Sequence, residues 1–200
     1  MPITYTNRKG RTYYLCLSTT KTGKPCYYFS REPTDNKLAE AIPPGYQIQE
    51  SVNGIVSLAK AGRLLISEEE INSVKKAVEK HPKARHYRVD VKSKQITIYE
   101  HVGPDLMELA PILAADLGIG RTLDKEMVHR LQEEERIYGQ FTPIMRFILT
   151  DDDKRLFRTE RMCFLGRIDD WIGIAYDKPI TKLAPVLIPK LGTDEFFELF

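Results

Sequence analysis

The first sixty residues alternate between short runs rich in aromatic and β-branched residues and polar segments that contain glycine or proline. Runs of this kind are typical of β-strands, because such side chains pack well on a pleated surface. The Asn53-Gly54 pair between two of the runs is a strong hairpin signal, since both residues tolerate positive φ angles. The pattern therefore predicts two hairpins, one from strands at 11–17 and 26–30, the other from strands at 46–50 and 55–58.

The spacing of apolar residues changes to three and four after residue 66, which predicts a helix from Glu68 to about Lys80. Ser67 and Glu70 have the spacing of a capping box, in which each side chain binds the backbone N–H of the other residue. The buried face of this helix is expected to carry three residues: Ile71, Val74 and Val78.

The rest of the chain combines strands and helices in separate runs. Alternating strands are predicted at 87–91 and 96–98, a kinked helical segment at 105–117, and a helix at 124–138 with Met127, Leu131 and Tyr138 directed inward. Strands at 144–149, 156–165 and 171–176 predict an antiparallel meander with Trp171 as a core anchor. A short last helix follows, with Phe196, Phe197 and Phe200 as apolar anchors.

These elements predict an α+β fold, because helices and antiparallel strands are not interleaved as βαβ units. We expect two domains: an N-terminal antiparallel β-module over 1–62 and an α+β domain with the meander over 63–200. The length of 200 residues is sufficient for both.

Composition places the chain among globular proteins, with 42% hydrophobic and 29% charged residues. No run of about 18 apolar residues or signal-peptide core occurs, so we expect no membrane partner and a cytoplasmic location. The cysteines Cys16, Cys26 and Cys163 form no Cys-x-x-Cys pair, and the four histidines lack zinc-ligand spacing. Neither a cofactor nor a catalytic residue is indicated.

The net charge of +2 hides a gradient along the chain. Residues 1–31 contain six basic residues and no acidic one, a net charge of +6, whereas residues 102–200 contain 13 basic and 18 acidic residues, a net charge of −5. A basic front and an acidic rear suggest different partners for the two parts, or two surfaces that attract each other.

The basic front also contains aromatic residues, a combination found where proteins bind single-stranded nucleic acid. Aromatic rings stack on bases while lysine and arginine side chains follow the phosphates. The candidate nucleic-acid-binding residues are Arg11, Tyr13, Lys21, Lys24, Tyr27, Phe29 and Arg31. The alternative is a packed sheet with a solvated basic turn, since strand alternation buries one set of these aromatics.

The acidic residues of the C-terminal part offer a weaker candidate site. Asp151, Asp153 and Glu160 lie on or between neighbouring predicted strands and could bind Mg²⁺ in a metal-dependent nuclease. Acidic residues are also ordinary components of hairpin turns, and no metal site is assigned on this pattern alone.

Several stretches resemble a group of uncharacterised bacterial proteins: TYYL at 12–15, KTGKP at 21–25, YYFS at 27–30 and IPPGY at 42–46. The stretches at 155–161 and 196–199 are also similar. This resemblance implies a bacterial origin but no activity.

The sequence thus favours a non-catalytic bacterial protein that binds nucleic acid through its basic N-terminal hairpin. An interaction protein of the antitoxin or inhibitor type, with an acidic face for a basic protein partner, is the first alternative. The Mg²⁺-dependent nuclease is the second.

Overall fold

The computed structural model of the chain describes residues 1–32, 37–103, 105, 109, 112, 125–164 and 169–198. The chain divides into two compact units. Unit 1 comprises Met1–Ala61 and Val102–Gln140, and unit 2 comprises Gly62–His101 and Phe141–Phe200. The segment Val102–Gln140, which the sequence analysis assigned to the second domain, therefore groups with the N-terminal part of the chain.

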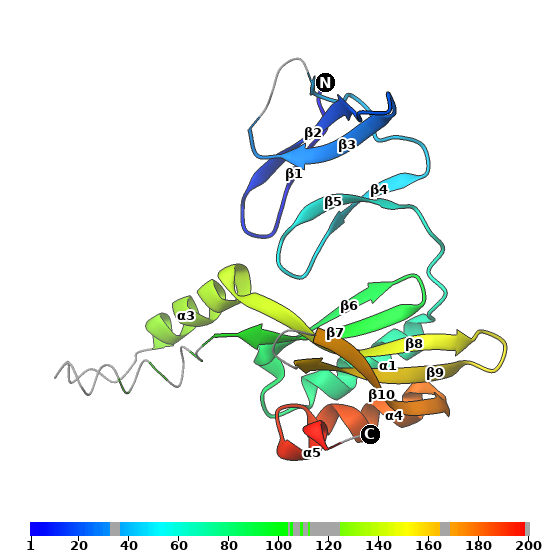
Figure 1. Ribbon diagram of the computed structural model, residues 1–200. Coiled ribbons are helices and arrows are strands. Elements are labelled where there is room, and N and C mark those ends of the chain that lie inside the picture. Colours follow the sequence, from blue (N-terminus) through cyan, green and yellow to red (C-terminus); the bar gives the residue numbers. More distant parts are fainter. Residues whose placement is uncertain are drawn as a thin grey trace. The chain divides into compact units, whose positions relative to one another are not determined.

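Unit 1 contains a three-stranded antiparallel sheet with the strand order β1-β2-β3 and a separate hairpin of β4 and β5 (Figure 1). The turns after β2 and β4 contain Gly23 and Gly54, whose φ angles of +79° and +76° suit glycine. The strands are β1 (Thr4–Thr6), β2 (Thr12–Thr19), β3 (Pro25–Ser30), β4 (Tyr46–Glu50) and β5 (Val56–Lys60). Both hairpins occur where the sequence predicts them.

Helix α3 (Lys125–Tyr138) also belongs to unit 1 and begins within one residue of the predicted start. The prediction that Met127 and Tyr138 point inward was wrong, because both side chains are exposed. Apolar residues are sparse in this charged helix, so they do not form a continuous buried stripe. The helical segment predicted at 105–117 lies largely outside the described residues.

Unit 2 contains a five-stranded sheet with the strand order β10-β9-β8-β7-β6 (Figure 1). Its strands are β6 (Tyr87–Lys92), β7 (Gln95–Val102), β8 (Gln140–Asp151), β9 (Leu156–Phe164) and β10 (Asp169–Lys178). The pairs β6–β7, β8–β9 and β9–β10 are antiparallel hairpins, which confirms the predicted meander and the α+β class.

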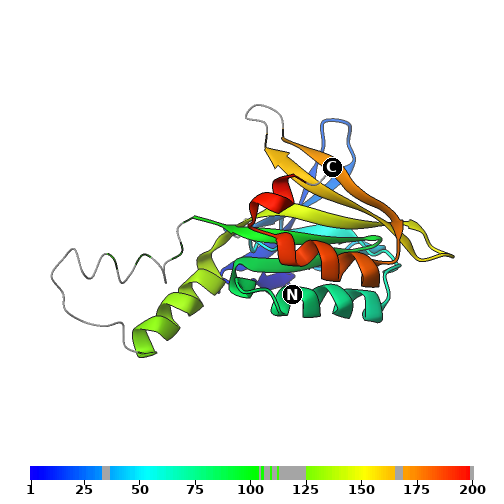
Figure 2. The same cartoon turned by 90° about the horizontal axis from the view of Figure 1, so that it is seen from below.

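The helices of unit 2 pack on one face of this sheet, where α1 and α4 lie side by side (Figure 2). They are α1 (Glu68–Glu79), α4 (Ile180–Leu187) and α5 (Asp194–Phe197), with short 3₁₀ turns η2 (Ala84–His86) and η3 (Ile188–Lys190). The capping box of α1 is present as predicted, with Ser67 as the N-cap and Glu70 as its partner. No helix in the described parts of the chain is both long and apolar enough to cross a membrane.

The core of unit 2 lies between the helices and the sheet. Its fully buried members include Val74 on α1, Ile98 on β7, Phe147 on β8 and Phe157 on β9. Trp171 does not belong to this cluster, which overturns its predicted role as a core anchor. Its ring instead lies 4.1 Å from the guanidinium of Arg146. Arg146 stands between the fully buried Met145 and Phe147 on β8 and therefore faces the opposite side of the sheet from them.

The last helix follows the prediction only in part. Phe196 is 2% exposed and anchors α5 in the core, whereas Phe197 is 56% exposed. Phe200, the third predicted anchor, lies outside the described residues. One short helical turn can direct only one of two consecutive side chains into the core, because neighbouring residues are about 100° apart around the helix axis.

Candidate nucleic-acid interface

The four predicted phosphate-binding cations lie at the two ends of the β2–β3 hairpin. Lys21 and Lys24 occupy the turn between the strands, while Arg11 directly precedes β2 and Arg31 directly follows β3. The register, with Tyr14 opposite Ser30, brings the two arginines to the same end. Six cross-strand residue pairs lie between the two ends, which corresponds to about 20 Å at the rise of an antiparallel strand.

All four of these cationic side chains are exposed. Among the residues that the structure describes, none of them forms an ion pair or a side-chain hydrogen bond. The turn itself is well ordered by backbone and threonine contacts, since Thr20 N donates to the Lys24 carbonyl at 2.8 Å and Lys24 N donates to Thr20 Oγ1 at 3.0 Å. The hairpin therefore presents two pairs of unneutralised positive charges on a fixed backbone.

The predicted stacking residues Tyr13, Tyr27 and Phe29 are half-buried and share one face of the sheet with the fully buried Leu15. Tyr5, opposite Tyr13 in the register, lies on the same face and donates from its hydroxyl to Glu50 Oε2 on β4 at 3.0 Å. This face is thus directed towards the β4–β5 hairpin. The three aromatics serve mainly in packing.

Tyr28 is an aromatic residue of β3 that the sequence analysis did not include among the candidates. It is 39% exposed, lies opposite Cys16 and faces the other side of the sheet from Tyr27 and Phe29. Its position near the middle of β3 places it between the two pairs of cations. Strand alternation separates Tyr28 from its neighbours, but the sequence alone does not say which face of the sheet is covered.

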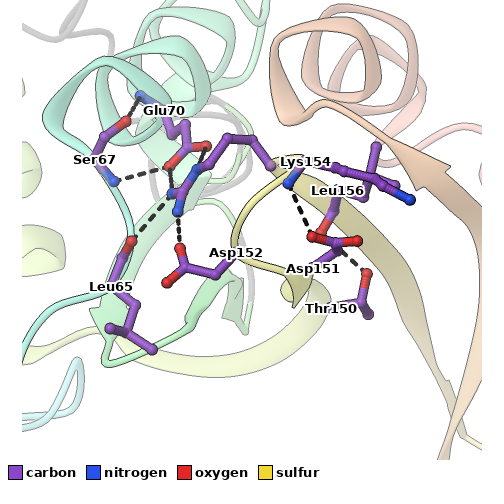
Figure 3. A network of polar contacts seen from close by, with 9 residues as sticks. Leu65, Ser67, Glu70, Thr150, Asp151, Asp152, Lys154 and Leu156 are labelled. Atoms are coloured by element: carbon purple, nitrogen blue, oxygen red, sulfur yellow. Dashed lines mark hydrogen bonds and ion pairs between the residues drawn. The ribbon is translucent and has the colours of Figure 1, made fainter.

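The acidic candidates do not come together. Asp151 accepts a hydrogen bond from Lys154 N at 2.9 Å in the β8–β9 turn (Figure 3). Glu160 lies within the sheet, where its two carboxylate oxygens bind Arg146 Nε at 2.6 Å and Arg158 Nη2 at 2.8 Å. In the described part of the chain, no three histidine, cysteine or acidic side chains are arranged to hold a metal ion.

The charges around the β8–β9 turn are instead used for structure. Arg155 has a positive φ of 53° and donates to Glu70, to the Leu65 carbonyl and to Asp152. Glu70 also accepts from Ser67 N at 2.8 Å, so one carboxylate joins the start of α1 to the β8–β9 turn (Figure 3). Burial raises the pKa of Glu70, but the hydrogen bonds from Arg155 and Ser67 outweigh burial and hold this pKa below its ordinary value.

Two hollows of about 520 and 290 Å³ lie along α1 in unit 2. Both include Ser73 and Lys76, and the second is also lined by Pro185 and Pro189. Neither contains any of the residues predicted to bind nucleic acid or metal.

Comparisons with protein-family models, curated proteins and solved structures found no match for this chain. Its function is therefore inferred from the arrangement of its own residues.

Proposed function

We propose that this protein binds nucleic acid without catalysing a reaction on it, and that the β2–β3 hairpin contacts the phosphate backbone. The observation that carries this proposal is the set of four exposed cations that have no acidic partner among the described residues: Arg11, Lys21, Lys24 and Arg31. Like charges repel each other, and a polyanion that binds them relieves this repulsion and releases its own counterions.

The spacing of the charges favours an extended polyanion over a compact anion. The two pairs of cations are separated by about 20 Å, which corresponds to about six nucleotides at the B-form rise of about 3.4 Å per phosphate along the helix axis. Tyr28, which is 39% exposed, lies between the pairs, where it can stack on an unpaired base. We therefore expect single strands to bind more tightly than duplexes of the same sequence.

The test is fluorescence anisotropy with labelled single- and double-stranded DNA and RNA over a series of salt concentrations. The variant Lys21→Ala/Lys24→Ala removes one pair of charges, and Lys37→Ala/Lys60→Ala removes two exposed lysines elsewhere in unit 1 as a matched control.

For the hairpin variant, the slope of log K against log salt should become less steep by about 1.4 for a single strand or 1.8 for a duplex. If binding at 1 M salt is unchanged, these slopes correspond to about 25- to 60-fold weaker binding at 0.1 M salt. Absence of binding to every strand at low salt would refute the proposal and direct attention to a protein partner. Equal losses in the hairpin and control variants would show that general charge, rather than the hairpin, determines binding.

A further inference from the structure

The turn between β1 and β2 carries three cations on a backbone that is unusually well fixed. Asn7 is 4% exposed, and its Oδ1 accepts from Lys9 N at 3.0 Å and from Arg11 N at 2.9 Å. The backbone closes the same turn, because Asn7 N donates to the Arg11 carbonyl and Gly10 N donates to the Asn7 carbonyl, both at 2.9 Å. Gly10 has a φ of +70°, which suits glycine at this position.

The same asparagine fastens the turn to the β4–β5 hairpin. Asn7 Nδ2 donates to the Gly54 carbonyl at 2.6 Å, and Arg8 N donates to Glu50 Oε1 at 3.1 Å. Each backbone N–H from Asn7 to Arg11 therefore has an acceptor. Because every backbone N–H of this turn already donates to an acceptor, a ligand at the turn is bound by side chains.

The side chains on this turn are strongly positive. Arg8, Lys9 and Arg11 are three cations within four residues, and Glu50, 3.8 Å from Arg8 Nε, is the carboxylate that the described contacts place beside them. Glu50 also accepts from Tyr5, so its negative charge is shared. An excess of positive charge therefore remains on this turn, whose backbone is held in place by the hydrogen bonds described above.

The excess of positive charge affects Lys9. Its Nζ lies 3.5 Å from the Tyr138 carbonyl, which is the only hydrogen-bond partner of this amine in the described structure. Burial lowers the pKa of Lys9, and the neighbouring charges of Arg8 and Arg11 lower this pKa further. A nearby anion acts in the opposite direction, because it stabilises the protonated amine.

We propose that Arg8, Lys9 and Arg11 form a phosphate-binding site on the β1–β2 turn. This inference rests on the proposed function in so far as the phosphate belongs to a nucleic-acid backbone, and it extends the interface to two cations, Arg8 and Lys9, that the hairpin analysis did not include. A free phosphate group has the same chemistry and would be bound by the same side chains. Arginine binds phosphate oxygens in pairs, and lysine adds a compact point charge.

The test uses the full chain and two variants. Arg8→Gln/Lys9→Gln removes from the turn the two charges that the hairpin interface does not share but keeps hydrogen-bonding side chains, while Lys37→Gln/Lys60→Gln removes two charges elsewhere in unit 1. Circular dichroism and thermal melting establish that each variant folds. Two probes are measured separately: a labelled oligonucleotide by anisotropy, and pyrophosphate by its protection of Lys9 from amine acylation, read by mass spectrometry.

If the site takes a backbone phosphate, the turn variant binds the oligonucleotide about 25- to 60-fold more weakly at 0.1 M salt, and the control variant does not. The oligonucleotide also protects Lys9 in the unmodified protein. If oligonucleotides do not bind at all but pyrophosphate protects Lys9, the site takes a free phosphate group and only the proposed function fails.

Two results overturn the inference. One is oligonucleotide binding that depends on Lys21 and Lys24 but not on Arg8 and Lys9, which would leave the proposed function intact. The other is Lys9 acylation that neither probe slows.

Discussion

The contact between Arg155 and Glu70 is expected to be a main stabiliser of unit 2. Arg155 Nε donates to Glu70 Oε1 at 3.0 Å, its Nη2 binds Glu70 Oε2, and Nη2 also donates to the Leu65 carbonyl at 3.1 Å. Glu70 is 7% exposed and completes the capping box with Ser67. Removing Arg155 therefore leaves a buried carboxylate without its cation and a turn without its link to α1 (Figure 3).

The expected loss follows from these contacts. A hydrogen bond to a charged group contributes about 1.5–3 kcal/mol, and removing one partner of a fully buried ion pair costs about 3–5 kcal/mol. Arg155 is about one-third exposed, which reduces the second figure because water screens the pair. We expect Arg155→Ala to lower the free energy of unfolding by about 2–4 kcal/mol.

The backbone of Arg155 supplies an internal comparison. A φ of 53° costs a residue with a Cβ about 1–2 kcal/mol relative to glycine. Arg155→Gly loses the same side-chain contacts as Arg155→Ala but avoids that cost, so the glycine variant should be about 1–2 kcal/mol more stable than the alanine variant.

The assay is urea unfolding followed through Trp171, the single tryptophan, which lies on β10 of unit 2. A double-mutant cycle with Arg155→Ala and Glu70→Gln should give a coupling of about 1.5–3 kcal/mol. A coupling below about 0.5 kcal/mol would refute the reasoning, because two side chains that do not stabilise each other give additive effects.

The contribution of Glu70 to the free energy of unfolding has a defined pH dependence. The pKa of Glu70 lies below its ordinary value of 4.5 in the folded protein, so the contribution of its charged form is complete above pH 4.5 and is lost as the pH falls through the folded-state pKa. Glu70→Gln cannot titrate. The stability difference between the unmodified protein and this variant should therefore shrink from pH 6 to pH 3, and a constant difference would contradict the assigned contacts.

Three further changes test other parts of the structure. Asn7→Ala removes three hydrogen bonds from a buried site and should destabilise unit 1 by about 2–3 kcal/mol. The loss is measured as faster hydrogen exchange of the β1–β3 amides, and unchanged exchange would show that the turn does not depend on this side chain. Gly54→Ala places a Cβ at a φ of +76° and 3.1 Å from Asn7 Nδ2, so we expect a loss of about 1–2 kcal/mol by the same measurement, and a neutral effect would contradict it. Arg146→Met removes the cation above Trp171 and one partner of Glu160, and should shift the tryptophan emission and lower the stability of unit 2 by about 1–3 kcal/mol. An unchanged emission spectrum would mean that Arg146 does not contact the ring in solution.

Local signals predicted most of the elements. The capping box of Ser67 and Glu70 located the start of α1, and Asn53-Gly54 located the turn between β4 and β5. Both signals depend on hydrogen bonds or φ angles within a few residues, so the sequence alone contains the necessary information.

Long-range packing could not be predicted in the same way. Alternation showed that Tyr27 and Tyr28 face opposite sides of the sheet, but how far each side is covered depends on packing against segments further along the chain, such as β5. Trp171 was expected in the core because it is large and apolar. The structure instead places its ring against Arg146, whose guanidinium lies over the face of the indole ring. Such a contact between a cation and an aromatic ring is favourable, so a tryptophan does not need the core to be packed.

The chain neutralises its charges unevenly, and this difference supports the proposed site. In unit 2, Arg146 and Arg158 share Glu160, and Arg155 binds Glu70. The chain has 28 acidic residues, so partners are not scarce; residues 1–31 simply contain none.

An external anion that neutralises the β1–β2 turn should also stabilise unit 1. A ligand at one hundred times its dissociation constant contributes about 2.7 kcal/mol, which is similar to the loss expected from Asn7→Ala. Asn7 holds the backbone N–H groups of Lys9 and Arg11, so it fixes the positions from which their side chains reach a phosphate. Ligand affinity and the order of the turn are then linked: Asn7→Ala should weaken phosphate binding although its own side chain carries no charge, because part of the binding free energy is used to order the turn again.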